Sequence, residues 1–320
     1  MLALAPTARH TVLVDGSARL LRFGRGDAAR GLPLLLVPSL INRWYVLDLR
    51  PGASVVEALV GAGLDVFCLD WGAPRDEDRY LTWDDLVVRL DRAVRRVRRL
   101  TGAPRVGLLG YSMGATLAAI EAARWPRRVA ALVNLAGPID FSRAGRLRTL
   151  ADPRWLSAEA MAAAGNIHPW TIRAGLVSVR PTDWVAKWVG LLDHLGDRAA
   201  LEDFWAREAW VSDNVAFPAG VYLRFVRDLY QRNELVAGEH HVAGRRVDLG
   251  AIECPVLTVV PDDDVICPPA SALALGEHVG STRVDVLRIP GSHIEAVVGP
   301  RAAQTLYPPL GRWLQDTLCS

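Results

Sequence analysis

The sequence predicts an α/β fold in which a mainly parallel central sheet is flanked by helices. Short apolar runs alternate with segments of helical periodicity over most of the chain. One of these runs leads through a glycine-flanked turn directly into a helix-forming segment. The chain of 320 residues is 51% hydrophobic and 22% charged, so it is long enough and apolar enough to bury such a core.

The elements are expected in a definite order along the chain. Two antiparallel strands, 11–14 and 19–22, open it, because Asp15-Gly16 between them is a strong hairpin signal. Buried strands of the parallel sheet are expected at 34–37, 66–69, 106–109, 131–135, 256–260 and 284–289. Helices are expected at 54–62, 84–100, 115–124, 270–278 and 301–318.

A helical, tryptophan-rich stretch interrupts the alternation after about residue 141, and the alternation resumes near residue 252. A helical insertion between the strands of an enzyme core is most simply a lid over the active site. We therefore expect a core of residues 1–141 and 219–320 and a helical lid of residues 142–218. We interpret the individual tryptophans as packing a small core of the lid itself. They are Trp155, Trp170, Trp184, Trp188, Trp205 and Trp210.

Charge and cysteine content exclude several classes of function. The formal net charge is only +2 with both signs mixed, so no nucleic-acid partner is expected, and the arginine-rich stretch 89–99 is interpreted as the solvated face of an amphipathic helix. The four cysteines lack the spacing of a zinc site or disulfide framework, which favours reduced thiols and a cytoplasmic location. No apolar run reaches the roughly 18 residues that a membrane span needs. No histidine pair stands at ligand spacing on a helix, so neither a metal nor another cofactor is expected.

The nucleophile is predicted from the segment Gly110-Tyr111-Ser112-Met113-Gly114, which lies between an apolar strand and a helix-forming run. This strand-turn-helix setting is what the G-x-S-x-G nucleophile elbow of the α/β-hydrolase fold requires. Glycine is needed on both sides because the turn is strained and the strand and helix approach closely. The sequence therefore predicts an α/β-hydrolase fold with Ser112 as the catalytic nucleophile.

The general base and its acidic partner are predicted from chain order. A serine hydroxyl needs a base, usually a histidine oriented by a carboxylate, and in this fold the order is Ser, then Asp or Glu, then His. Among seven histidines, His293 is the one in a loop directly after a late apolar strand. Three adjacent aspartates follow strand 256–260, and the usual hydrolase phrase that ends in proline fits Asp264. We predict Asp264 as the acid, with Asp263 as the alternative.

The donors that would stabilise an oxyanion are expected to be backbone N–H groups. One is that of Met113, directly after the nucleophile, and the other belongs to the loop after strand 34–37. In that loop Leu40 is the first choice and Ile41 the second.

Several segments together resemble the polyhydroxyalkanoate synthases and their α/β-hydrolase relatives. They are the stretches 36–51, 66–72 with 82–85, 222–226 with 233–239, and 244–249. The similarity covers roughly residues 32–310 and is weakest over the lid. It implies a lidded hydrolase fold and an acyl-transfer site for hydroxyacyl thioesters, with the roles of nucleophile, acid and base on Ser112, Asp264 and His293.

The chain departs from that family in two places. The polymerases use cysteine as nucleophile where this chain has Ser112, and they commonly carry histidine where it has Val265. A serine ester is a less activated acyl donor than a thioester, which places polymerisation in doubt.

The function expected from these residues is that of a serine hydrolase or acyltransferase. It would form an acyl-Ser112 ester from a small-molecule ester, an acyl-CoA or an acyl-carrier thioester, and pass the acyl group to water or a small nucleophile. The alternatives are true polymer synthesis and a non-catalytic relative that binds a granule or a partner. A homodimer is left open.

Overall fold

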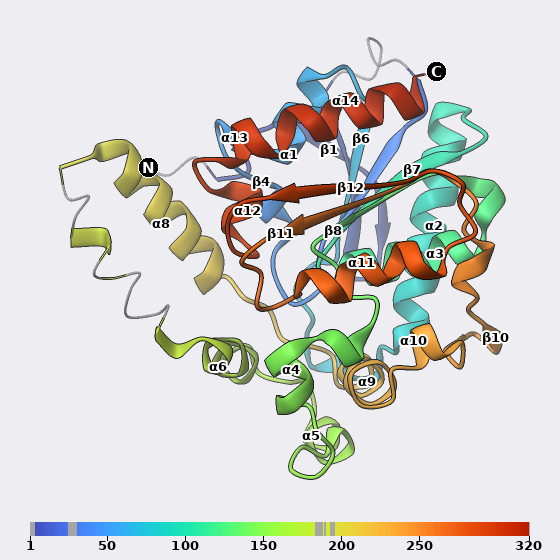
Figure 1. Ribbon diagram of the computed structural model, residues 1–320, viewed down its shortest axis with the longest axis vertical. Coiled ribbons are helices and arrows are strands. Elements are labelled where there is room, and N and C mark those ends of the chain that lie inside the picture. Colours follow the sequence, from blue (N-terminus) through green and yellow to red (C-terminus); the bar gives the residue numbers. More distant parts are fainter. Residues whose placement is uncertain (1–3, 25–30, 183–187, 189, 193–195, 320) are drawn as a thin grey trace.

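An eight-stranded sheet runs through the centre of the molecule, as Figure 1 shows for the computed structural model, which describes residues 4–24, 31–182, 188, 190–192 and 196–319. The strand order is β1-β2-β6-β3-β7-β8-β11-β12. The strands from β6 to β12 in this order are parallel to one another, whereas β2 pairs antiparallel with both β1 and β6. Their bounds are β1 (Arg9–Asp15), β2 (Ala18–Phe23), β3 (Leu34–Val37), β6 (Val66–Asp70), β7 (Val106–Tyr111), β8 (Val129–Leu135), β11 (Val256–Pro261) and β12 (Val284–Ile289). The predicted strands and the mainly parallel sheet are thus confirmed.

Helices cover both faces of the sheet (Figure 1). One face carries α2 (Trp83–Thr101), α3 (Met113–Arg124) and α11 (Pro269–His278), and the other carries α1 (Val55–Gly61) and α14 (Tyr307–Leu318). Successive side chains of a strand point to opposite faces. In β3, Leu35 therefore packs in the apolar cluster with α2 and α3, whereas Leu34 and Leu36 pack in the cluster with α1 and α14.

Local signals set the ends of α2. At its N-terminus, the Thr82 hydroxyl accepts a hydrogen bond from Asp85 N at 3.2 Å, and the Asp85 carboxylate accepts one from Thr82 N at 2.8 Å. Such a reciprocal pair satisfies two N–H groups that lack helical partners. After the helix, Gly102 adopts a φ of 70°, the left-handed conformation that favours glycine.

The prediction of one helix over 301–318 was wrong. The segment forms α13 (Ala302–Thr305) and then α14, which begins at Tyr307 and has proline in its first turn. Pro308 and Pro309 have no N–H to donate to a preceding turn, so they start a helix but do not continue one.

Several short elements were not predicted individually, although the helices within residues 219–237 lie in the stretch that was expected to be helical. The short elements are β4 (Asp48–Arg50), β5 (Ala53–Ser54), β9 (His241–Val242), β10 (Arg245–Arg246), α9 (Ala219–Arg224), the π-helix η6 (Phe225–Gln231), α10 (Glu234–Ala237), α12 (Glu295–Val298) and 3-10 turns at Trp44–Leu47, Asp76–Tyr80, Pro126–Arg128, Phe141–Arg143 and Leu249–Ala251. These elements are short, and their segments do not show the uninterrupted apolar run that marks a short buried strand.

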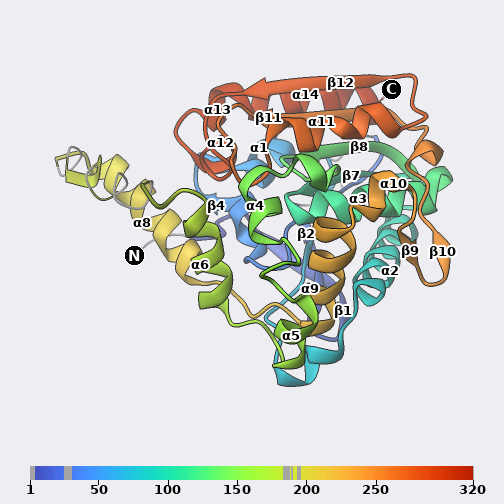
Figure 2. The same ribbon diagram turned by 60° about the horizontal axis from the view of Figure 1, so that its bottom comes forward.

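The inserted segment is helical, and Figures 1 and 2 show it outside one edge of the sheet. Its helices include α4 (Gly145–Leu150), α5 (Ala158–Ala163), α6 (Pro169–Val179) and α8 (Arg198–Ser212), and the N-terminal end of α8 projects from the rest of the molecule. α5 packs against α9 and α8 against β4, so these helices rest on neighbouring elements.

The interpretation that the tryptophans pack a core of the lid is wrong for most of them. Trp210 is 3% exposed, but Trp155, Trp170, Trp188 and Trp205 are 59%, 69%, 37% and 49% exposed. Trp188 and Trp205 both pack against the ring of Phe204, with centroids 5.4 and 5.3 Å apart, but a large part of each ring remains at the surface. Trp184 lies outside the described residues.

Among the described residues, no helix is both long and apolar enough to cross a bilayer, and no group of three or more His, Cys, Asp or Glu side chains could hold a metal ion. Cys68, Cys254 and Cys267 are buried thiols.

Glu121 is a buried acid in α3 that makes stability depend on pH. Its side chain is 0% exposed, and neither carboxyl oxygen has a hydrogen-bond partner among the described residues. Burial, reinforced by Asp91, raises the pKa of Glu121 from 4.5 to about 8. The folded state therefore keeps a proton on Glu121 that the unfolded chain loses above about pH 4.5. Because the folded state binds one proton more in this range, the free energy of unfolding falls as the pH rises from about 4.5 toward 8.

We expect Glu121→Gln to match the wild type in stability near pH 5 and to exceed it at pH 8. One proton of difference between the folded and unfolded states changes the free energy of unfolding by about 1.4 kcal/mol for each pH unit. The gap in unfolding free energy between the variant and the wild type should therefore grow by on the order of 2 kcal/mol between pH 6 and pH 8. Urea unfolding at several pH values measures it, with exposed Glu253→Gln as the control. A gap that stays constant with pH would contradict the assignment of a proton to Glu121.

Candidate active site

Ser112 lies at the sharp turn between β7 and α3. Its backbone has φ 55° and ψ −129°, a conformation that residues other than glycine rarely adopt. Ser112 N donates to Leu135 O at 3.0 Å, which holds the turn against the end of β8. A Cβ at Gly110 would lie 2.2 Å from Ala115 Cα, so the flanking glycine is required by the close approach of strand and helix. The turn places the serine at the N-terminus of α3, where developing negative charge is favoured.

Asp264 and His293 meet at the neighbouring strand ends, after β11 and β12. His293 Nδ1 and Asp264 Oδ2 are 2.6 Å apart, and both residues are buried, at 9% and 3% exposure. The other carboxylate oxygen, Oδ1, accepts hydrogen bonds from Ile266 N and Cys267 N at 2.9 and 2.8 Å. The carboxylate is therefore fixed on one side by two amides and faces the imidazole with the other. This is the arrangement that orients a general-base histidine.

Of the three adjacent aspartates, Asp264 is the one that contacts His293. Asp262 and Asp263 are exposed, and Asp262 pairs with Arg288 at 3.4 Å. His240 is fully buried at 0% exposure although Glu239 and His241 on either side of it are exposed, and its ring meets Trp83 edge-on with ring centroids 6.3 Å apart. Burial lowers the pKa of His240 to about 4, so it is neutral at pH 7.

Tyr111 connects the histidine to the nucleophile turn, a role that the sequence did not reveal. Its ring stacks on the His293 ring with centroids 5.2 Å apart, and its hydroxyl donates to His293 O at 3.3 Å. Because Tyr111 directly precedes Ser112, this stack holds the imidazole beside the elbow. The motif itself could have indicated this role, because Tyr111 is its residue between the first glycine and the nucleophile.

The loop after β3 passes against the N-terminus of α3. A Cβ at Gly114 would lie 2.0 Å from Val37 O and 2.6 Å from Pro38 O, so only glycine allows this approach. Trp71 Nε1 also donates to Pro38 O at 2.9 Å. Met113 is the first residue of α3, so its N–H has no partner within the helix. The loop that contains Leu40 and Ile41 therefore lies against the N-terminal end of α3, which begins at Met113.

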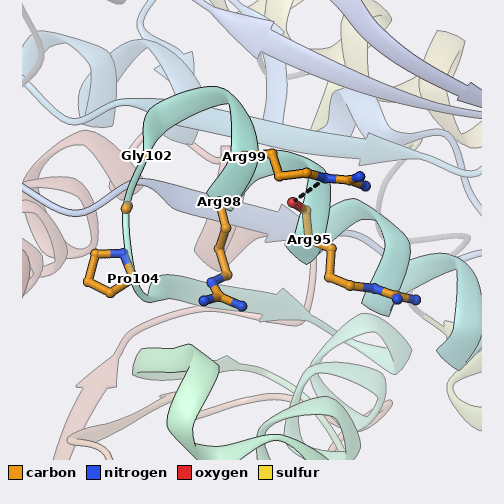
Figure 3. A pocket seen from close by; sticks show the side chains of 6 residues that line it. Arg95, Arg98, Arg99, Gly102 and Pro104 are labelled. Atoms are coloured by element: carbon orange, nitrogen blue, oxygen red, sulfur yellow. Dashed lines mark hydrogen bonds between the residues drawn. The ribbon is translucent and has the colours of Figure 1, made fainter.

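The basic stretch of α2 lies elsewhere in the molecule. Arg95, Arg98 and Arg99 line a hollow of about 470 Å³ with Gly102 and Pro104, at the end of α2 and before β7 begins (Figure 3). Parallel strands present their functional residues at their carboxyl ends, and this hollow lies at the opposite end of β7 from Ser112. Arg92, Arg95 and Arg99 are exposed, as expected for the solvated face of a helix.

Comparison with known proteins identifies the family. Residues 33–166 match the family model described as the alpha/beta hydrolase fold. The poly(3-hydroxyalkanoate) polymerase subunit PhaC of Allochromatium vinosum is 31% identical over 96% of this chain and 88% of its own length. This chain belongs to the poly(3-hydroxyalkanoate) polymerase family. The PhaC polymerase subunit of Haloferax mediterranei is 32% identical over 98% of the chain, which spans 65% of that relative's length.

The fold assignment of this polymerase-family member is supported by solved structures as well. A thioesterase domain from the curacin biosynthetic pathway superposes with a TM-score of 0.56 at 14% identity, covering 96% of this chain and 99% of that domain. At that identity the likeness concerns the fold alone. The predicted α/β-hydrolase fold and the predicted resemblance to the polymerase family are both confirmed.

Proposed function

We propose that this polymerase-family chain is an acyltransferase or hydrolase that forms an acyl-Ser112 ester from an ester or hydroxyacyl thioester. The observation that carries the proposal is the buried pair of Asp264 and His293 at 2.6 Å, held by the Tyr111 stack beside the strained Ser112 turn. In this role His293 takes the proton of the Ser112 hydroxyl as the hydroxyl attacks the acyl carbon. Asp264 stabilises the imidazolium that forms.

The second half of the proposed reaction uses the same groups. The N–H of Met113 and one from the loop at Leu40 or Ile41 would stabilise the oxyanion of the tetrahedral intermediate. His293 then returns its proton to the leaving alcohol or thiol and activates the acceptor that takes the acyl group from Ser112. We propose that residues 142–218 act as a lid over this site.

Polymer synthesis is the second candidate, and the names of the relatives favour it. Two PhaC polymerase subunits match nearly the whole chain at 31% and 32% identity. A polymerase passes the acyl group to the hydroxyl of another hydroxyacyl unit, whereas a hydrolase passes it to water. The difference lies in the acceptor, so both candidates share Ser112, Asp264 and His293.

A labelling and product experiment tests the proposal. A fluorophosphonate probe should label the protein covalently, because it reacts with an activated serine. Incubation with 3-hydroxybutyryl-CoA should then release free CoA, and mass spectrometry separates free acid from oligomers. A protein that neither reacts with the probe nor releases CoA or alcohol from any thioester or ester offered would contradict an acyl-serine enzyme.

Ser112→Cys tests whether polymer chemistry is latent in the site. A thiol has a lower pKa than a hydroxyl, and its acyl-enzyme is a thioester, a better acyl donor than an oxygen ester. We nevertheless expect the variant to hydrolyse more slowly than the wild type and to form no oligomers, because polymer growth needs an activated hydroxyl acceptor and Val265 supplies no base beside Asp264. Oligomers from the variant or from the wild type would instead support polymer synthesis.

A further inference from the structure

The loop after β3 is held by the inserted helical segment as well as by the core. We call residues 38–43 the oxyanion loop and residues 210–214 the α8 end. Asn42 Nδ2 donates to Asn214 Oδ1 at 2.6 Å, and Trp210 Nε1 donates to Arg43 O at 2.9 Å. Just after the loop, Tyr45 donates its hydroxyl to Asp213 Oδ2 at 2.8 Å. With the ion pair between Arg43 Nε and Asp213 Oδ2 at 3.7 Å, four polar contacts therefore join two segments about 170 residues apart in the sequence.

The two halves of the oxyanion loop have different supports. Its first residue, Pro38, is fixed by the core, through Trp71 and the close approach to Gly114. Its last residues, Asn42 and Arg43, are fixed by the α8 end. The proposed donors Leu40 and Ile41 lie between these supports, so the position of their N–H groups depends on both.

The α8 helix is in turn anchored to the core by buried charge. Asp203 is 3% exposed and pairs with Arg50 of β4 at 2.9 Å and with Arg207 at 2.8 Å. Arg207 also reaches Glu295 at 3.8 Å, and Glu295 accepts a hydrogen bond from Ser292 at 3.1 Å. Ser292 directly precedes His293, so α8 contacts the histidine loop as well as the oxyanion loop.

We propose that Asn214 and Asp213 are positioning residues that hold the oxyanion loop, through Asn42 and Tyr45, in the geometry that stabilises the oxyanion. The inference rests on the proposed acyl transfer at Ser112 and extends it. It makes formation of the oxyanion site conditional on the seating of α8 against the core. Any movement of the inserted segment that withdraws the α8 end would release the second half of the loop.

The expected effect follows from the geometry of oxyanion stabilisation. Loss of one oxyanion donor lowers kcat by about 10²- to 10³-fold, and a displacement of about 1 Å of a catalytic group has effects of a similar order. Removal of the Asn214 side chain loosens the loop but leaves its donors in the chain. We therefore expect Asn214→Ala to lower kcat by about 10- to 100-fold with KM nearly unchanged, the pattern of an interaction made in the transition state.

Asn166→Ala is the matched control for Asn214→Ala. Asn166 is also an asparagine of the inserted segment that bonds to the core, because its Nδ2 donates to Arg75 O at 2.7 Å. Its Oδ1 accepts a hydrogen bond from Ala219 N at 3.2 Å, and in the structure's described part it forms no hydrogen bond with residues 38–43. Steady-state kinetics with a p-nitrophenyl ester and hydrogen exchange of the peptide 38–47 are measured for the wild type and both variants. We expect slower kcat and faster exchange in the Asn214 variant and neither change in the Asn166 variant.

A double-mutant cycle adds a readout that a general loss of packing would not move. Asn42→Ala should reproduce the effect of Asn214→Ala. The kcat of the double variant should be no lower than that of the more affected single variant, because both substitutions remove the same hydrogen bond. Equal losses of kcat in the Asn166 and Asn214 variants would overturn the proposal, and so would unchanged exchange of residues 38–47 in the Asn214 variant. A wild type with no Ser112-dependent turnover would instead contradict the proposed function, and the exchange comparison would still decide whether Asn214 holds the loop.

Discussion

Ser112→Ala is expected to lower turnover by a factor on the order of 10³ or more while the fold is retained. Without the hydroxyl no acyl-enzyme forms, and the remaining donors and substrate contacts supply only a residual acceleration over water. The rate of p-nitrophenol release under saturating ester measures the effect. Thermal unfolding should change little, since alanine and serine have the same steric limits at a φ of 55°.

Ser281→Ala is the control for this substitution. Ser281 lies just before β12, and its hydroxyl bonds, among the described residues, only to the backbone of Arg283, at 3.0 and 3.2 Å. Its alanine variant should retain the wild-type rate. A Ser112→Ala protein with a near-normal rate would show that turnover does not pass through Ser112.

Asp264→Asn is expected to lower turnover by roughly 10³- to 10⁴-fold, because the substitution forces the wrong tautomer on His293. Oδ1 of Asp264 accepts two backbone N–H bonds, so the carbonyl oxygen of an asparagine must take that position. Its NH₂ group then faces Nδ1 of His293 and donates to it. The ring must carry its proton on Nε2, where it can no longer accept one from Ser112.

Neighbouring aspartates provide matched comparisons. Asp262→Asn and Asp263→Asn should keep turnover within about twofold of the wild type, because both side chains are exposed and neither contacts His293 among the described residues. The comparison of kcat across the three variants measures the assignment. A crippled Asp263 variant beside a mild Asp264 variant would mean that the carboxylate is assigned one residue too late.

The mainly parallel sheet and the positions of its strands along the chain could be predicted because the buried strands are uninterrupted apolar runs. β3, β7 and β11 are buried at every position, and each is followed by a segment with turn or helix signals. Burial on both faces leaves a strong pattern even in four residues. The strand ends then give the location of Ser112, Asp264 and His293, since functional loops follow the carboxyl ends of parallel strands.

The inserted segment could be recognised as helical but not interpreted further. Its exposed tryptophans look the same in a sequence as buried ones, because burial depends on which face meets the core. The contacts that it makes are also between distant residues. Asn42 and Asn214 bond to each other across 172 positions, and no local pattern indicates such a pair.

The tyrosine of the elbow illustrates a third limit. Tyr111 was predicted only as a position of the nucleophile turn, and the structure also makes it the last residue of β7. Its stack on His293 depends on the packing of the loop after β12 over the end of β7, which comes from tertiary structure.

The most direct test of the central claim is the site of covalent modification by a fluorophosphonate. Trypsin cleaves after Arg105 and Arg124, and the peptide 106–124 between them contains Ser112 as its single serine. Mass spectrometry of the labelled and digested protein should find the phosphonate adduct on this peptide, at Ser112, and should find none after Ser112→Ala. An adduct at another residue, or an unlabelled peptide 106–124 in a protein that turns over ester, would contradict Ser112 as the nucleophile.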